Sequence, residues 1–421
     1  MDIGILKKRL KYKIQISLCL VLLFLICGTE AFAAVTEGKP GETLSGEYAV
    51  IVNTNTTSQE STGTLVFDSS AGRSAVVRSA ASADSTGQDV PAGAGSTVVT
   101  SASSSYAVGT EKVITSGSSS QTYVCIGEGS HCYIWMSKTL KAGYDAAGKT
   151  AAIARDMART YDGVPYQMLS TLAGGAIPCQ DNTGKLSVLL ETLSGASGVY
   201  RGDYGITAIH INVPDAASYR LGAMESRNGL LVHEGQHALF HLMTGYDAYQ
   251  PYTWLNEGLA VAAMDYIWGG TDSSGWMDGI AGNADIRNGS SLFYRTYRDS
   301  SARDYGMPYL FVRYLIARKT GSYNPMGLFP AFYQQSANCD PGTYVTKVLG
   351  DGTKFSDLLT EFYTAIIAQE PSGKYGFAGD AIVYEKVKNY PLYMGSSGSA
   401  HTLAPTGAIA IRLQNGTFTV P

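Results

Sequence analysis

The stretch of sequence that most restricts the fold of this chain is residues 230–240, an apolar run that contains two histidines four residues apart. Residues with this spacing lie on one face of an α-helix. His233 and His237 can therefore present two imidazole nitrogens to one metal ion, and Glu234 lies beside the first of them. The pattern predicts a helix that carries two ligands of a metal site.

A third candidate ligand, Glu257, follows His237 by twenty residues. Its sequence neighbours are mostly apolar, and a carboxylate buried among such side chains needs a partner, which a metal ion would supply. Two histidines and one glutamate are the protein ligands of a catalytic Zn²⁺ site and leave one coordination position for water. The spacing H-E-x-x-H indicates that Glu234 is the general base that takes a proton from this water. We therefore expect one zinc ion per chain.

The histidine motif followed by Glu257 resembles the gluzincin metallopeptidases, the clan that includes thermolysin. Within that clan, the sequence Leu-Asn-Glu-Gly-Leu-Ala at residues 255–260 resembles the hyicolysin family of secreted bacterial neutral zinc peptidases. The resemblance covers roughly residues 120–370. It implies an α+β, thermolysin-like zincin domain with an upper sheet above a helical half. The implied activity is zinc-dependent endopeptidase action on protein or peptide substrates.

The resemblance also implies a hydrogen-bond donor for the oxyanion of the tetrahedral intermediate, because related peptidases use a Tyr or His from a later helix. Tyr305 is our candidate, since it precedes Gly306 at the start of a predicted helix over residues 304–319. Tyr309 and Tyr294 are the alternatives.

Two other functions compete with the endopeptidase. A zinc aminopeptidase is suggested by Gly-Ala-Met-Glu at residues 222–225, which is similar to the G-x-M-E-N segment that holds a substrate's amino terminus in the aminopeptidase N group. Glu225, however, lies only eight residues before His233, and Ser226 replaces the Asn, so the endopeptidase is favoured. A non-catalytic exported binding module on a peptidase scaffold is disfavoured because Glu234 and all three ligands are present.

Three further polar residues near these motifs have structural interpretations. His241 continues the row of histidines, but each step of four residues rotates by about 40° on a helix, so we expect a core or supporting role. His210 lies on a predicted strand over residues 206–213, which resembles the substrate-binding edge strand of the clan, and we interpret it as an ordinary strand residue. Asn256 is expected to fix the local backbone.

The first 34 residues have the features of an export signal. Five basic residues precede the apolar run at residues 14–27, and Ala-Phe-Ala at residues 31–33 is a cleavage signal. A membrane anchor is the alternative. Cleavage would leave 26 basic and 33 acidic residues, a net charge of −7, which does not favour nucleic acid or anionic membranes. We expect a secreted, periplasmic or extracellular protein without stable membrane insertion.

Four cysteines remain after the expected cleavage, and an even number in an exported chain predicts disulfides. Cys125 and Cys132 are close enough in sequence to join a hairpin, which leaves Cys179 and Cys339 as the second pair. Metal binding by cysteine is the alternative, but no C-x-x-C spacing supports it.

The order of the patterns predicts an α+β chain with strands before helices. Alternating residues at 48–52, 63–67 and 74–78 and a hairpin at 123–136 predict an N-terminal β-sandwich or barrel over residues 35–137. Helical periodicity at 222–244, 251–267 and 304–319 falls in the catalytic domain, residues 138–392. Two short strands after residue 406 predict a C-terminal β module over residues 393–421. The oligomeric state is not predicted.

Overall fold

The computed structural model describes residues 43–45, 48–54, 56, 61–65, 105–116, 119–181, 183–202, 205–245, 252–293, 302–335, 338–394, 399–413 and 417–419. The expected export signal, the predicted strand at residues 74–78 and Tyr294 lie outside these ranges.

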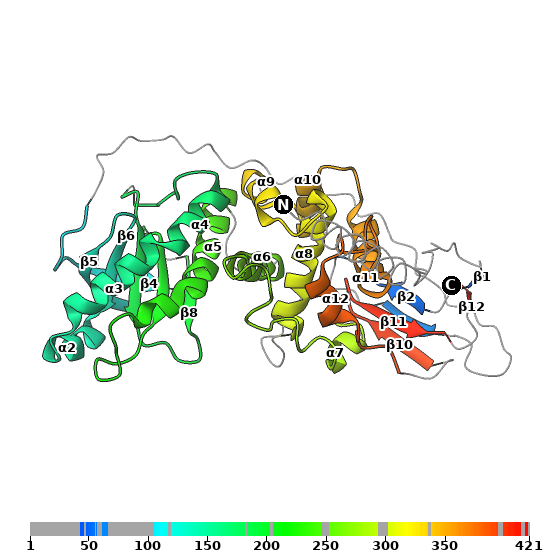
Figure 1. The fold of residues 1–421 in the computed structure, drawn as a ribbon, viewed down its shortest axis with the longest axis horizontal. Helices are drawn as coiled ribbons and strands as arrows, with labels where there is room; N and C mark the ends of the chain where they lie inside the picture. Colours follow the sequence, from blue (N-terminus) through cyan, green and yellow to red (C-terminus); the bar gives the residue numbers. More distant parts are fainter. Residues whose placement is uncertain are drawn as a thin grey trace, which may run out of the picture. The chain divides into compact units, whose positions relative to one another are not determined.

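A mixed six-stranded sheet forms the first part of the fold, in the order β4-β5-β6-β7-β9-β8 (Figure 1). Its strands are β4 Glu111–Ser116, β5 Ser119–Glu128, β6 Cys132–Ser137, β7 Leu186–Glu191, β8 Gly198–Tyr200 and β9 Ala208–Asn212. β6, β7 and β9 are parallel, whereas β4, β5 and β8 pair antiparallel with their neighbours. Every residue of β6 and β7 is buried, as expected for central strands covered on both faces.

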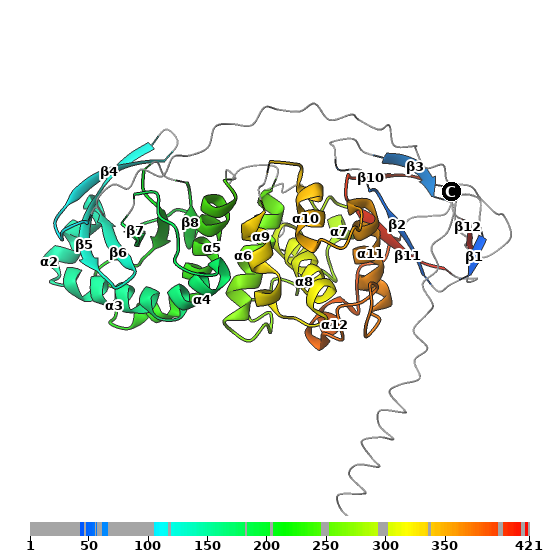
Figure 2. The same ribbon diagram turned by 90° about the horizontal axis from the view of Figure 1, so that it is seen from above.

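The helices lie partly between strands β6 and β7 and mostly after the last strand of the sheet, β9. They are α2 Lys138–Ala146, α3 Thr150–Asp162, α4 Val164–Ala173, α5 Asn228–Thr244, α6 Thr253–Tyr266, α7 Ala284–Arg287, α8 Met307–Thr320, α9 Phe329–Gln334, α10 Pro341–Leu349, α11 Phe355–Ala368 and α12 Ala381–Val387, with 3₁₀ turns η1 Ala223–Arg227 and η3 Pro325–Gly327 and a π-helical turn η2 Ala302–Gly306. α2 and α3 precede β7 and pack against β5 and β6 of the sheet (Figure 2), and Ile153 and Met157 of α3 belong to the same buried core as Ile134 of β6. The predicted α+β class is confirmed. No helix in the described ranges is long and apolar enough to cross a membrane.

Strands from the two ends of the chain pair with each other. β1 Thr43–Ser45 pairs with β12 Thr417–Thr419, β2 Tyr48–Val52 with β11 Ala408–Arg412, and β3 Ser61–Leu65 with β10 Ser399–Leu403, all antiparallel. Figures 1 and 2 both show the blue and red strands side by side. Val50 of β2 and Ala410 of β11 pack against the main hydrophobic core, which joins this pair to the helical half.

Strand pairings cross both predicted domain boundaries, the one after residue 137 and the one after residue 392. β6 ends at the predicted boundary at residue 137 and pairs with β7, which lies beyond it. β2 and β11 pair across the boundary at residue 392. The described strands of residues 35–137 therefore divide between the main sheet and the terminal pairs.

The predicted disulfides are not formed. The four cysteines assigned to them are free thiols: Cys125, Cys132, Cys179 and Cys339. Cys125 packs with Tyr133 and Trp135 on one face of the sheet, whereas Cys132 packs with Ile134 on the other. Side chains on opposite faces of a sheet cannot reach each other, so Cys125 and Cys132 cannot form a disulfide although they lie close together in the sequence.

Candidate metal centre

Two buried helices carry the residues of the histidine motif and Glu257. α5 follows the 3₁₀ turn η1, so it begins at Asn228 rather than at residue 222, and it ends where Gly245 adopts φ of 71°. Gly235 on α5 faces Leu169 of α4 so closely that a Cβ atom would lie 2.4 Å from Leu169 Cδ1. Gly258 on α6 faces α8 equally closely, since a Cβ atom there would lie 2.5 Å from the carbonyl oxygen of Pro308. These glycines permit the close helix packing that fixes the two helices.

His233, His237 and Glu257 bring one ligand atom each to a common point. The Nε2 atoms of the two histidines are 3.2 Å apart, and Glu257 Oε2 lies 3.4 Å from His233 Nε2 and 3.6 Å from His237 Nε2. Ligands about 2.0–2.1 Å from a tetrahedral zinc ion are about 3.3 Å from one another. The three atoms therefore form a triangle of the size that one such ion requires, and this group could hold a metal ion.

The charges of the three side chains support one another. Burial alone lowers the pKa of His237, but the Glu257 carboxylate outweighs it and raises the pKa to about 9. Burial raises the pKa of Glu257, but the attraction of His237 and His233 holds it well below the usual value. A carboxylate buried beside two imidazoles is a site that attracts a cation.

Asn256 contacts the metal-binding group more directly than predicted. It is buried, and its interaction with His237 is one of the contributions that raise the pKa of that imidazole. His237 Nδ1 and Asn256 Oδ1 are both buried, and neither has a hydrogen-bond partner among the described residues. A polar neighbour of this kind can fix the orientation of a ligand imidazole.

Glu234 lies between α5 and the edge strand β8. Burial, together with the nearby Glu257 carboxylate, raises the pKa of its carboxyl group above the usual value, although His233, His237 and a hydrogen bond from the Tyr200 backbone N–H act in the opposite direction. A Cβ atom on Gly198 would lie 3.0 Å from Glu234 Cγ. Glu234 is thus a buried carboxyl group one residue from a candidate ligand, with the sheet edge directly against it.

The strand compared with the substrate-binding edge strand is not at the edge of the sheet, because the edge strand β8 precedes it in the chain. β9, which carries His210, pairs with β7 on one side and β8 on the other, so it is an inner strand. His210 is buried and its Nδ1 lies 2.5 Å from Glu191 Oε1. β8 occupies the edge instead, and its three residues, Gly-Val-Tyr, are too few to show a strand pattern.

His241 has a partner on β8. Its Nδ1 lies 2.5 Å from the hydroxyl oxygen of Tyr200, and the two rings meet edge to face. The supporting role expected for His241 therefore has a definite contact. Glu225, which raised the aminopeptidase alternative, is exposed in the 3₁₀ turn η1.

The candidate oxyanion donors lie in different surroundings. Tyr305 is half-buried in the π-helical turn η2 and stacks on Trp276, with ring centroids 4.8 Å apart. Tyr309 is fully buried, and its hydroxyl donates to Asp265 Oδ2 at 2.5 Å while accepting from Arg313 at 2.7 Å. Tyr309 therefore belongs to a polar cluster, and Tyr305 keeps the role of predicted donor.

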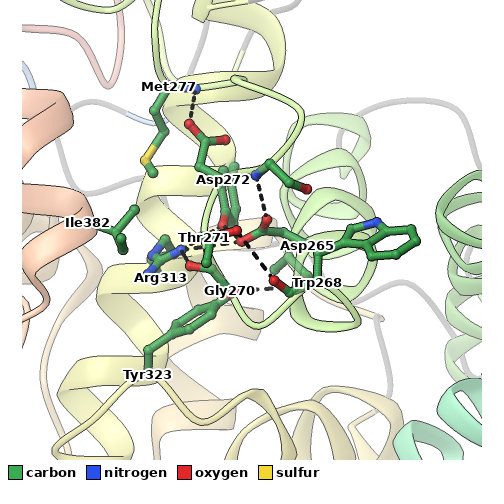
Figure 3. Close-up of polar contacts among 12 residues, drawn as sticks. Asp265, Trp268, Gly270, Thr271, Asp272, Met277, Arg313, Tyr323 and Ile382 are labelled. Atoms are coloured by element: carbon green, nitrogen blue, oxygen red, sulfur yellow. Dashed lines mark hydrogen bonds and ion pairs between the residues drawn. The ribbon is translucent and has the colours of Figure 1, made fainter.

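This polar cluster ties the end of α6 to α8 (Figure 3). Asp265 Oδ1 accepts from the backbone N–H of Ser273 at 3.1 Å, and Arg313 donates to the carbonyl oxygen of Gly270 at 2.8 Å. The Arg313 guanidinium also lies 3.8 Å from the ring centre of Tyr323 and forms an ion pair with Asp380. The cluster fixes the segment that follows α6, and no motif in the sequence indicated it.

No family model matches the chain, and a comparison with curated proteins found no match.

Proposed function

We propose that this protein is a zinc-dependent endopeptidase of the gluzincin type, with a thermolysin-like zincin fold. The observation that supports it most is the triangle of ligand atoms from His233, His237 and Glu257, with Glu234 one residue from the first ligand. Imidazole and carboxylate ligands suit zinc, and three protein ligands are typical of catalytic rather than structural zinc sites.

When bound, zinc would act as a Lewis acid that lowers the pKa of a water molecule and polarises the carbonyl group of the scissile peptide bond. The protein residues would then move the proton. Glu234 accepts it from the attacking water and delivers it to the nitrogen of the leaving amine. The burial of Glu234 suits this role, because a raised pKa makes its carboxylate a stronger base toward the attacking water.

A hydrogen-bond donor would stabilise the oxyanion that develops during attack. Tyr305 is proposed for this role. Its half-buried hydroxyl-bearing ring is supported by Trp276, and aromatic stacking of this kind holds a ring in one orientation.

The decisive experiment combines metal analysis of the purified full chain with hydrolysis of casein and of peptides blocked at both ends. An endopeptidase cleaves the blocked peptides internally and loses this activity when a chelator removes the zinc. An aminopeptidase would cleave only peptides with free amino termini, and a binding module would hold zinc or peptide without hydrolysis.

The proposed site of action is outside the cytoplasm, on protein or peptide substrates. This proposal rests on the basic and apolar segments of residues 1–34. Mass spectrometry of exported material should find a mature chain that begins near Ala34 or Val35, whereas an intact segment over residues 1–33 would favour a signal anchor.

A further inference from the structure

The edge strand β8 presents its backbone to Glu234. The N–H of Asn212 donates to the carbonyl oxygen of Ser197 across the β8–β9 pair at 2.9 Å. Hydrogen-bonded residues alternate along an antiparallel pair, so the backbone groups of Gly198 and Tyr200 point away from β9. The outward N–H of Tyr200 is the group that donates to the Glu234 carboxylate.

A three-residue strand that pairs on one side only needs a second support to hold its place. That support is the side chain of Tyr200, whose hydroxyl forms the 2.5 Å hydrogen bond with His241 Nδ1 on α5. Gly202 packs beside the imidazole ring of His241, because a Cβ atom on Gly202 would lie 3.5 Å from His241 Cε1. Strand β8 thus contacts α5 at Glu234 and again, two turns later, at His241.

We propose that Tyr200 and His241 are positioning residues that hold β8 on α5, so that the backbone N–H of Tyr200 orients the Glu234 carboxylate. The inference deepens the proposed function and rests on Glu234 being the general base. His241 has neither a ligand nor a base role in it, and it contributes the hydrogen bond with Tyr200 that fixes the strand.

The test uses variants of the zinc-loaded full chain. Tyr200→Phe removes the hydroxyl and keeps the ring and the backbone N–H, and His241→Leu removes the ring nitrogens. His241→Asn places an amide near the position of Nδ1, where it can donate or accept. Tyr384→Phe, at an exposed residue of α12, is the matched control. The readouts are kcat and KM on a peptide blocked at both ends, and zinc content.

We expect Tyr200→Phe and His241→Leu each to lower kcat about tenfold, the effect of one lost hydrogen bond, with KM and zinc content unchanged. The double variant should fall no further, since both changes remove the same contact. His241→Asn should recover most of the activity. Additive losses in the double variant, or normal kcat in both single variants, would overturn the inference.

Failure of the proposed function is recognised separately, because the wild-type chain would then not cleave the blocked peptide. Amide hydrogen exchange in residues 197–201 decides the inference in that case. Faster exchange in Tyr200→Phe than in Tyr384→Phe supports the anchoring contact, and equal exchange in the two variants overturns it.

Discussion

Among single residues, the three candidate ligands should be the ones on which metal content depends. Replacing His233, His237 or Glu257 by Ala removes one corner of the triangle, and two remaining ligands bind zinc weakly. We expect each variant to lose the roughly one zinc per chain that the wild type holds. Metal analysis after dialysis measures this zinc content. His401→Ala is the control, because His401 lies on β10 and contacts the backbone carbonyl oxygen of Asn288 rather than the three candidate ligands. Stoichiometric zinc in all three variants would exclude the site.

Glu234 should be needed for the reaction and not for the metal. Glu234→Gln keeps the shape and the hydrogen bond from Tyr200 but cannot take the proton. We expect hydrolysis of blocked peptides to be abolished while zinc content stays at the wild-type value. Activity near that of the wild type would assign the base to another residue.

Tyr305 and Tyr309 should behave differently when each hydroxyl is removed. Tyr305→Phe should lower kcat about 100- to 1000-fold with KM and zinc little changed, as for loss of one oxyanion donor. Tyr309→Phe breaks the contacts with Asp265 and Arg313 and should lower the free energy of unfolding by about 1–3 kcal/mol instead. Steady-state kinetics and urea unfolding separate the two effects. A Tyr305→Phe rate within about threefold of wild type would remove Tyr305 from the mechanism.

Between elements, the close contact of α6 with α8 should control the position of Glu257. Gly258→Ala places a methyl group 2.5 Å from the carbonyl oxygen of Pro308, so the helices must separate. We expect the free energy of unfolding to fall by about 1–3 kcal/mol and zinc affinity to fall with it. Urea unfolding and a zinc competition titration measure the two quantities.

Gly143→Ala is the matched control for this prediction. Gly143 lies inside α2, where an added Cβ atom meets nothing within 4 Å. Alanine is about 1 kcal/mol more favourable than glycine in a helix, so this variant should be more stable and bind zinc normally. Equal effects of the two substitutions would mean that α6–α8 packing does not position Glu257.

The elements near the site could be predicted where the sequence pattern lies within a single helix or strand. The spacing of His233 and His237 is a property of one helix, and the apolar neighbours of Glu257 lie within one turn of it. β8 was missed because three residues carry no alternation. The Asp265–Arg313 contact was missed because its partners lie on two separate helices, α6 and α8, and the pattern within one helix does not show which residue of another helix it contacts.

For the whole molecule, the α+β class followed from the order of the patterns, whereas strand partners did not. β2 was predicted over the residues it occupies, but its partner β11 lies more than 350 residues further along the chain. Periodicity reports which face of a strand is apolar and carries no information about distant partners. The disulfide prediction was wrong for a related reason, because sequence distance between Cys125 and Cys132 did not reveal the face that each occupies.

The terminal strand pairs should contribute to the stability of the whole fold. Ile409 of β11 is buried against Leu403 and Ile411. Ile409→Ala should lower the free energy of unfolding by about 2–5 kcal/mol. Val113→Ala, on an exposed position of β4, should change it by less than about 0.5 kcal/mol. Thermal unfolding measures both, and equal melting temperatures for the two variants would show that the terminal strands add no stability.

The pairing of the first strands with the last has a consequence for the timing of folding. During synthesis, β1, β2 and β3 leave the ribosome first, and their partners β12, β11 and β10 leave it last. Contacts this distant in sequence form slowly and only after both partners exist. A nascent chain that ends before residue 399 therefore carries three unpaired strands, and these terminal sheets assemble only once synthesis is complete.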